Sequence, residues 1–470
     1  MNLITSIIRR ILPKASVYTL ANSERLKMAD KCDPIRTVLR DLEAEREDLR
    51  PVSGEQHPPK PPPGLNALVR RIEETRRSLQ ACAESLLTRN WTVTGEAFVG
   101  SLEIDGVAMR FMKAHSIRAM SIAIAREGVL TGNRGYTWAE PEYPITQPDT
   151  RFRIASVAKL FTCAAISRLA KTRLLTFETR AFAFLGITGK LLPSQTPDPD
   201  IGKVTILQLA TELSGLARDF GTAANGGNDF REISGRIGQA TVPTRDQLVR
   251  FLYGEPLERR PGETPEPGDN PYSNSAFTML TSIVEKAFGS SFIEFLNFEL
   301  LGPLGIGDVD VGATAENGRK PKEVSSYDDE GASPAQTDMR PDAVAPNAYG
   351  GTFVLENGEG AGGLITSTGT IARFLGANAV YGVGPRPAVS NGGRYGRLAG
   401  SGAAALNRLD GFDFAFAFNR SVDYADYDVL AAKINGIIDR HSRLVLAPVY
   451  TLIARVAQII RILVSPLIAR

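Results

Sequence analysis

A serine and a lysine three residues apart begin an apolar stretch of the chain, "RFRIASVAKLFTCAAISRLA", which starts at Arg151. A serine hydroxyl attacks a carbonyl carbon only if a nearby base takes its proton. A lysine amine can be that base when burial and a helix N-terminus disfavour its charged form. Because residues i and i+3 of a helix share a face, Lys159 can point its amine at Ser156. The pair therefore predicts acyl transfer through a serine nucleophile.

The same spacing also has an ordinary structural explanation. A Ser-x-x-Lys pattern is expected about once by chance in a chain of this length. Ser156 would then be a helix N-cap, and Lys159 a solvated residue of the first turn. The histidines, His57, His115 and His441, are widely scattered, so a serine–histidine–acid triad has few candidates. If Ser156 is a nucleophile, we expect its base not to be histidine.

A second group of polar residues precedes a later helical pattern. The stretch "PGDNPYSNSAFTMLTSIVEKAFG" places Tyr272 and Asn274 directly before apolar residues at helical spacing. Tyrosine can share the proton transfer, and asparagine can orient the lysine amine and a substrate amide. Taken alone, "YSN" indicates only the start of a helix.

Together the two motifs resemble those of the class C β-lactamase and penicillin-binding-protein superfamily, which also includes serine esterases and D-amino-acid-specific peptidases. Further segments are similar to this superfamily in the expected order between Gly95 and His441, among them "VTILQLATELSGL", "LLGPLGIGDV" and "GAGGLITSTGTIARFL". The resemblance implies an α/β (α+β) domain with the β-lactamase/transpeptidase-like fold. Such a domain has an antiparallel sheet flanked by helices and a mostly helical subdomain; here we expect helical N- and C-terminal extensions as well.

The third motif of the superfamily is a lysine or histidine, a small residue and a glycine, on the strand that borders the site. The best match is "RYG", from Arg394 to Gly396. Arginine stays protonated and cannot act as a base, but it can bind a carboxylate. An alternative alignment uses "GSG" at 400–402, which contains no cation. The resemblance assigns Asn274, Arg394 and Gly396 to substrate binding.

Two other positions depart from the superfamily pattern. Glu212 stands where the superfamily often has histidine, and Thr370 where an aspartate commonly follows the Ser-Thr segment. We interpret both differences as local repacking.

The resemblance also implies a reaction. Ser156 would attack a carbonyl and form an acyl-enzyme, and Lys159 and Tyr272 would relay its proton to the leaving group. The backbone N–H groups of Ser156 and Arg397 would form the oxyanion hole. No metal or organic cofactor is implied.

Composition limits the other function classes. The 470 residues are 43% hydrophobic and 23% charged, which is typical of a globular protein. With 54 basic and 52 acidic residues, the net charge of +2 gives no general attraction to nucleic acid. Cys32, Cys82 and Cys163 are too few and too far apart for a disulfide framework or a zinc site.

Hydrophobic periodicity predicts the elements that position these residues. "MSIAIAREGVLTGNRGY" alternates and predicts a hairpin that turns at Glu127-Gly128. The run from Phe161 to Ile166 predicts a helix buried on all sides. "GFDFAFAFNR" predicts a further strand, so strands lie at both ends of the domain with helices between them. We therefore expect one sheet assembled from both ends of the domain around a helical insertion.

The chain divides into four predicted regions: an extension with a Pro-rich linker (1–63), a docking helix (64–94), the hydrolase domain (95–441) and a C-terminal helix (442–470). Residues 1–23 contain no acid and predict a membrane-surface helix or an organellar presequence. The last segment is interrupted by Arg455 and Arg461, so it does not form a membrane span. It fits a helix at a membrane surface, or one packed on the domain or on another subunit.

We therefore expect a serine hydrolase that cleaves an ester or an amide of a small molecule or peptide, with esters first. The alternatives are a D-amino-acid peptidase, a β-lactamase, and a non-catalytic, membrane-associated scaffold with the same fold.

Overall fold

The computed structural model describes residues 89–220, 230–327, 332–334, 344–350, 353–383 and 392–441, together with short stretches at 38, 41–42, 70–72 and 74–75. The predicted C-terminal helix lies outside the described residues, as do nearly all of 1–63 and most of 64–94. Within the described part of the chain, no helix is both long enough and apolar enough to cross a membrane.

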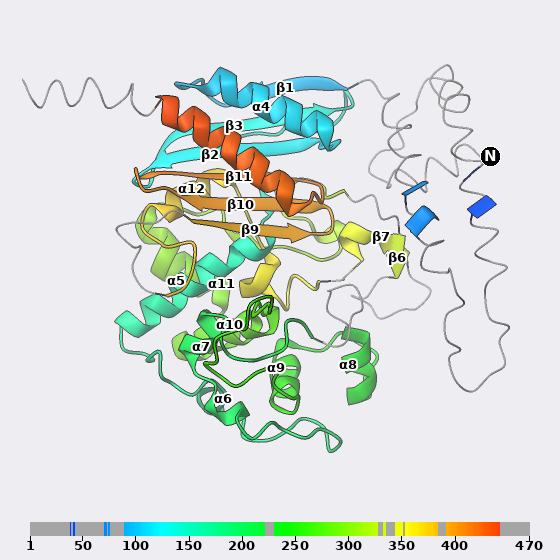
Figure 1. Ribbon diagram of the computed structural model, residues 1–470, viewed down its shortest axis with the longest axis vertical. Coiled ribbons are helices and arrows are strands. Elements are labelled where there is room, and N and C mark those ends of the chain that lie inside the picture. The colour runs from blue at the N-terminus through cyan, green and yellow to red at the C-terminus, as the bar shows by residue number, and fades with distance from the viewer. Residues whose placement is uncertain are drawn as a thin grey trace, which may run out of the picture.

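One antiparallel sheet of six strands forms the centre of the domain (Figure 1). Its strands, in spatial order, are β1 (Asn90–Thr94), β3 (Val129–Ala139), β2 (Ala119–Arg126), β11 (Phe412–Phe418), β10 (Ser401–Asn407) and β9 (Gly392–Leu398). β2 pairs directly with β11, although almost three hundred residues separate them. This pairing confirms the prediction that the sheet is assembled from both ends of the domain.

The hairpin between β2 and β3 turns where the sequence predicts. Glu127 has φ 52° and Gly128 has φ 81°. Positive φ at both central residues is the geometry that suits the twist of a two-residue hairpin. The start of the sheet differs from the prediction, because Asn90–Thr94 forms strand β1 and not the end of a docking helix. β-branched residues favour a strand there, and Trp91 pairs with Trp138 of β3.

The two faces of the sheet carry side chains of different size. The phenylalanines of β11 pack in one cluster with α4 (Ser101–Ala114) and with the helix over 424–441. Figure 1 shows these two helices lying over the sheet. The alanines at 415 and 417 face the opposite cluster, which contains α12 (Thr368–Leu375) and α5 (Ala158–Lys171). Small side chains on that face let helices pack close to the strands that border the site.

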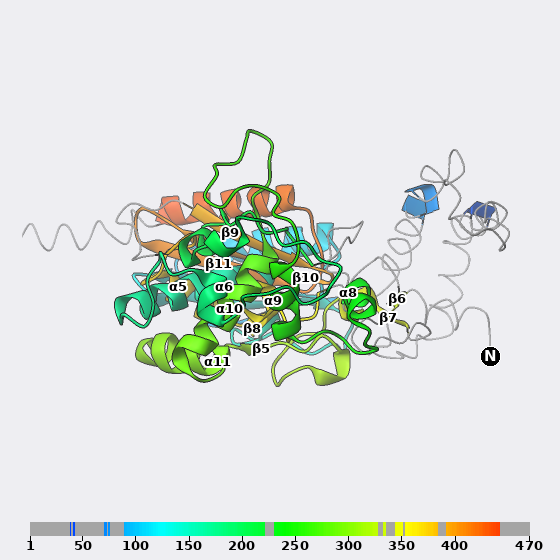
Figure 2. The same ribbon diagram turned by 90° about the horizontal axis from the view of Figure 1, so that it is seen from below.

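A mostly helical region lies below the sheet in Figure 1 and in front of it in Figure 2. Its helices are α6 (Ala181–Leu185), α7 (Ile206–Ala210), α8 (Phe230–Ile237), α9 (Arg245–Tyr253), α10 (Asn274–Phe288) and α11 (Phe292–Phe295). α7, α9 and α11 each begin with a capping box, in which a threonine or serine hydroxyl and a glutamine or glutamate three residues later satisfy each other's backbone N–H groups. This region is the predicted helical insertion.

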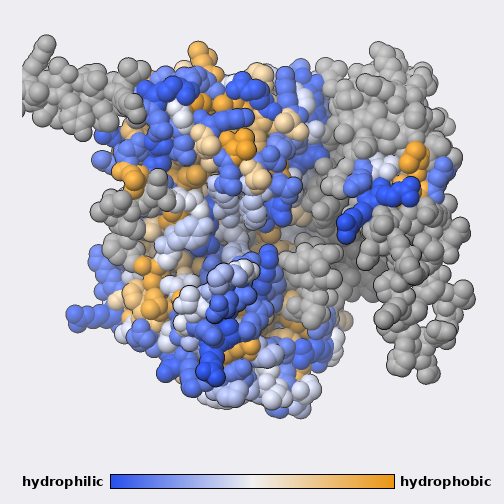
Figure 3. Space-filling view, in the orientation of Figure 1, coloured by the Kyte–Doolittle hydropathy of each residue, from blue (hydrophilic) through white to orange (hydrophobic). Residues whose placement is uncertain are grey.

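Shorter elements connect the two regions. β4 (Phe152–Arg153), β8 (Leu364–Thr366) and β5 (Asp310–Val311) form a small sheet, and β6 (Ala332–Pro334) pairs with β7 (Val344–Pro346). The short 3₁₀ and π segments are η1 (Ala155–Val157), η2 (Ile201–Lys203), η3 (Leu296–Leu301), η4 (Gly302–Leu304), η5 (Glu316–Gly318), η6 (Asn347–Tyr349) and η7 (Glu359–Gly363). On the face shown in Figure 3, hydrophilic and hydrophobic residues of the described part are interspersed.

Candidate active site

Ser156 lies in the 3₁₀ turn η1, between β4 and α5. The preceding residue, Ala155, has φ 47°, in the left-handed region that residues other than glycine rarely adopt. Such strain persists only where the surrounding packing holds it, often at functional sites. The N-cap of α5 is Val157, and the Ser156 hydroxyl is hydrogen-bonded to the hydroxyl of Tyr272. The alternative in which Ser156 is a helix N-cap is therefore wrong.

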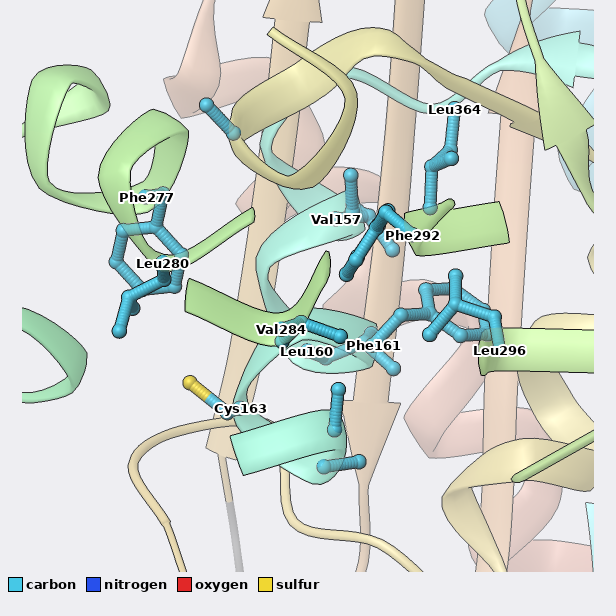
Figure 4. Close-up of a cluster of buried hydrophobic side chains, with 14 of the residues drawn as sticks. Val157, Leu160, Phe161, Cys163, Phe277, Leu280, Val284, Phe292, Leu296 and Leu364 are labelled. Carbon is cyan, nitrogen blue, oxygen red and sulfur yellow. The ribbon is translucent and has the colours of Figure 1, made fainter. Parts of the chain in front are cut away.

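The apolar run that follows Ser156 buries Lys159. Helix α5 is buried from Ala158 to Ile166, which confirms the predicted central helix. Leu160 and Phe161 lie among apolar side chains of α10 and α11 (Figure 4). Lys159 has no solvent-exposed surface, so the alternative of a solvated lysine is also wrong.

The amine of Lys159 contacts four oxygen atoms. Its Nζ lies 3.3 Å from Ser156 Oγ, 2.7 Å from the Tyr272 hydroxyl, 2.7 Å from Asn274 Oδ1 and 2.6 Å from the carbonyl oxygen of Ala361. The structure therefore brings together Ser156, Lys159, Tyr272 and Asn274. Ala361 belongs to η7, within the glycine-rich stretch that resembles the superfamily.

Two of these oxygens can only accept hydrogen bonds: the carbonyl of Ala361 and the Oδ1 atom of Asn274. A neutral amine has two N–H groups and one lone pair. With both N–H groups donated to these acceptors, the lone pair of Lys159 faces the hydroxyls of Ser156 and Tyr272. This is the arrangement that a base requires.

Burial and charge set the protonation of the two groups that surround Ser156. Burial lowers the pKa of Lys159 well below its ordinary value, and the guanidinium of Arg394 lowers it further. The nearby carboxylates of Glu212 and Asp219 act in the opposite direction on this pKa. Burial also raises the pKa of Tyr272, so the phenol stays protonated at neutral pH, although its hydrogen bond with Ser156 opposes the shift.

Asp219 is a member of the site that the sequence did not reveal. The Nδ2 atom of Asn274 donates to its carboxylate at 2.6 Å, which fixes the amide so that Oδ1 faces Lys159. Burial raises the pKa of Asp219, against the effects of Asn274 and Arg218. Nothing in the spacing of "LARDF" marks this aspartate, because it meets Asn274 only through the tertiary fold.

Arg394 lies in β9, with its side chain buried beside the site. Its Nε atom donates to the carbonyl oxygen of Val380 at 3.1 Å, and its guanidinium lies 4.4 Å from the centre of the Tyr381 ring. An Nη atom lies 3.6 Å from a carboxylate oxygen of Glu212. The interpretation of Glu212 as local repacking is therefore incomplete, because this residue pairs with the cation of the third motif.

Gly396 places β9 against the nucleophile turn. A Cβ atom at this position would lie 2.3 Å from the carbonyl oxygen of Ile154 and 2.8 Å from the backbone nitrogen of Ser156. β9 is an edge strand of the sheet, and Arg397 follows Gly396 in it. The side chain of Arg397 contacts Asp423 at 2.9 Å.

The geometry favours the alignment of the third motif at 394–396 over the alternative at 400–402. Gly400 has φ 70° and lies in the turn between β9 and β10. Ser401 donates its hydroxyl to the carbonyl oxygen of Arg153. The strand next to Ser156 therefore carries "RYG".

The change at Thr370 has a structural explanation. Ser367 caps α12, and its backbone N–H donates to Asp308 at 3.2 Å. The Thr370 hydroxyl is hydrogen-bonded to the same carboxylate. Asp308 thus supplies, from a distant loop, the acid that a capping box would take from the helix itself.

The fold is that of the β-lactamase/transpeptidase-like serine hydrolases. Residues 104–422 match the family model described as Beta-lactamase, and this range is more than half of the chain. The chain therefore belongs to the Beta-lactamase family, and the resemblance drawn from its motifs is confirmed.

Individual relatives are distant. Protein flp of Staphylococcus aureus (strain MRSA252) is 24% identical over 205 residues, which are 43% of this chain and 36% of that protein. The chain thus spans about a third of the length of this curated relative.

Solved structures show the same fold. The D-amino acid amidase from Ochrobactrum anthropi SV3 aligns with a TM-score of 0.52 and 17% identity, over 73% of this chain and 99% of that one. The hydrolase EstCE1 aligns with a TM-score of 0.50 and 16% identity, over 69% of this chain and 94% of that one. At these identities the likeness establishes the fold, and the activity must be argued from the site.

Proposed function

We propose that this protein is a serine hydrolase that cleaves an ester or amide through an acyl-enzyme on Ser156. The observation that carries the proposal is the buried amine of Lys159, within 3.3 Å of both the Ser156 and the Tyr272 hydroxyls. A buried amine with a lowered pKa can accept a proton near neutral pH.

In the proposed reaction, the Oγ atom of Ser156 bonds to the carbonyl carbon while its proton passes through Tyr272 to Lys159. The tetrahedral intermediate expels the alcohol or amine, which takes that proton, and leaves an acyl ester on Ser156. Water then attacks this ester with the same groups acting as base and acid, which releases the carboxylic acid and restores the serine.

The oxyanion hole in this proposal consists of the backbone N–H groups of Ser156 and Arg397. The contact of Gly396 with the Ser156 turn supports it, because β9 lies directly against the nucleophile. One such donor contributes about 3 to 4 kcal/mol to lowering the barrier.

Esters are the proposed first substrate class. A peptidase that recognised a substrate carboxylate through Arg394 would need an unpaired positive charge, and here a carboxylate oxygen of Glu212 already lies 3.6 Å from the guanidinium. D-amino-acid peptidase and β-lactamase activity are the alternatives that an assay must compare with esterase activity.

The deciding experiment is intact-mass spectrometry after incubation with a fluorophosphonate, on wild type and on Ser156→Ala. We expect one adduct on the wild type and none on the variant, because only an activated serine displaces fluoride at a useful rate. A wild type that is folded by circular dichroism yet forms no adduct would instead support the non-catalytic scaffold.

We also propose, from sequence alone, that residues 1–63 and 442–470 bind an anionic membrane surface. The full-length protein should cosediment with vesicles of phosphatidylcholine and phosphatidylglycerol at low salt, and less so as salt screens the attraction. Absence of binding at low salt would contradict this.

A further inference from the structure

The cation of the third motif is neutralised from within the protein. Among the described residues, the Oε1 atom of Glu212 is buried, has no hydrogen-bond partner, and lies 3.6 Å from an Nη atom of Arg394. The side chain of Arg394 is only 5% exposed. The nearby carboxylate offsets the charge of this guanidinium, which weakens its attraction for a substrate anion.

The backbone at Glu212 shows that this residue is held in place. Its φ of 61° lies in the left-handed region, where a residue with a Cβ atom is strained. One oxygen of its carboxylate is buried without a hydrogen-bond partner, which carries a further cost unless a cation is close. A residue that is retained at such a cost to stability is expected to have a function, and its charged contact here is with Arg394.

The position of the pair relates it to the substrate. Arg394 and Gly396 are two residues apart in β9 and are both buried on the same face, and Gly396 touches the Ser156 turn. Two residues of a strand span about 7 Å. A group a few bonds away from the scissile carbonyl therefore reaches the neighbourhood of Arg394.

We propose that Glu212 is an internal counter-ion that takes the place of a substrate carboxylate on Arg394, so that the site selects neutral acyl substrates and discriminates against those with a carboxylate near the scissile bond. This inference rests on the proposed serine hydrolase function. It assigns Glu212 and Arg394 a role in specificity and none in bond making or breaking.

The test uses two fluorophosphonates of equal length, whose alkyl tails end in a carboxylate or in a carboxamide. The two probes differ in charge and hardly in shape. The measured quantity is the second-order labelling rate of the carboxylate probe divided by that of the carboxamide probe. Wild type should label faster with the carboxamide probe. In Glu212→Gln the ratio should move about tenfold or more toward the carboxylate probe, because the freed guanidinium forms a charge-assisted hydrogen bond.

Two further variants separate charge from fold. If Glu212→Gln folds poorly, Glu212→Gly takes its place in the test, because it removes the side chain at a backbone conformation that suits glycine. It should move the ratio of labelling rates in the same direction. The double variant Glu212→Gln/Arg394→Met should lose the gain, because the guanidinium proposed to attract the carboxylate tail is removed.

The outcomes are distinguishable from failure of the proposed function. No labelling of folded wild type by either probe would overturn the hydrolase proposal itself. Labelling with a ratio that stays the same in both Glu212 variants, or wild-type preference for the carboxylate probe, would overturn the counter-ion inference alone.

Discussion

The amine of Lys159 lies nearer to the hydroxyl of Tyr272, at 2.7 Å, than to that of Ser156, at 3.3 Å. The two hydroxyls are also hydrogen-bonded to each other. A proton that leaves Ser156 thus has a continuous path through the phenol to the amine. The tyrosine can accept the serine proton and donate its own to lysine without ever becoming a free phenolate.

This arrangement predicts the effect of Tyr272→Phe. Removing only the hydroxyl breaks the relay, and labelling by a fluorophosphonate, or kcat/KM for an ester, should fall by about 10² to 10⁴, the usual contribution of a proton-transfer group. Tyr253→Phe is a matched control, because Tyr253 packs against Phe182 in the helical region. A loss of less than about threefold in Tyr272→Phe would contradict the relay.

The pH dependence should report on Lys159. The neutral amine is the reactive form, so the rate should rise with pH through the lowered pKa of Lys159 and level off above it. Burial raises the pKa of Tyr272, and it raises that of Cys163 to about 11, so neither group adds a transition near neutral pH. A measured profile without this rise would contradict Lys159 as the base.

The same profile should shift in opposite directions in two variants. The carboxylate of Glu212 favours the charged form of Lys159, so Glu212→Gln should move the rise to lower pH. The guanidinium of Arg394 disfavours that form, so Arg394→Met should move the rise to higher pH. Equal shifts in one direction would show that the variants act through the fold and not through charge.

Local patterns were sufficient to predict the parts of the fold that depend on periodicity. The alternation in β2 and β11, the turn at Glu127-Gly128 and the buried α5 all follow from residue order alone. β1 was missed because five residues after an unbroken helical pattern carry little signal, and their strand character comes from pairing with β3.

The site was predictable where a motif is contiguous and not where contacts cross the fold. Ser156 and Lys159 share a turn, so their spacing was informative. Asp219 reaches Asn274 across 55 residues, and Glu212 reaches Arg394 across a still longer separation. A single sequence contains no signal that links such partners.

Asp219→Asn should show that this carboxylate is a positioning residue. An asparagine keeps the volume but can turn its NH₂ toward the Asn274 amide, which then loses a charge-assisted hydrogen bond. Such a bond contributes about 1.5 to 3 kcal/mol, so we expect a loss of roughly 10- to 100-fold in kcat with little change in KM. Asp219→Glu should recover part of the rate. If Asp219→Asn had the thermal stability and the kcat of the wild type, the positioning role of Asp219 would be contradicted.

Gly396→Ala tests whether β9 must lie against the nucleophile. The added Cβ atom would stand 2.3 Å from the carbonyl oxygen of Ile154, so the strand or the Ser156 turn has to move. Overpacking of this kind costs about 1 to 3 kcal/mol, and a shift of the proposed oxyanion donors should lower kcat by a further 10²-fold or so. Gly393→Ala is the matched control in the same strand, because its Cβ would meet no atom closer than 3.5 Å. If both variants kept wild-type labelling by the fluorophosphonate, the oxyanion hole would have to be formed by residues outside β9.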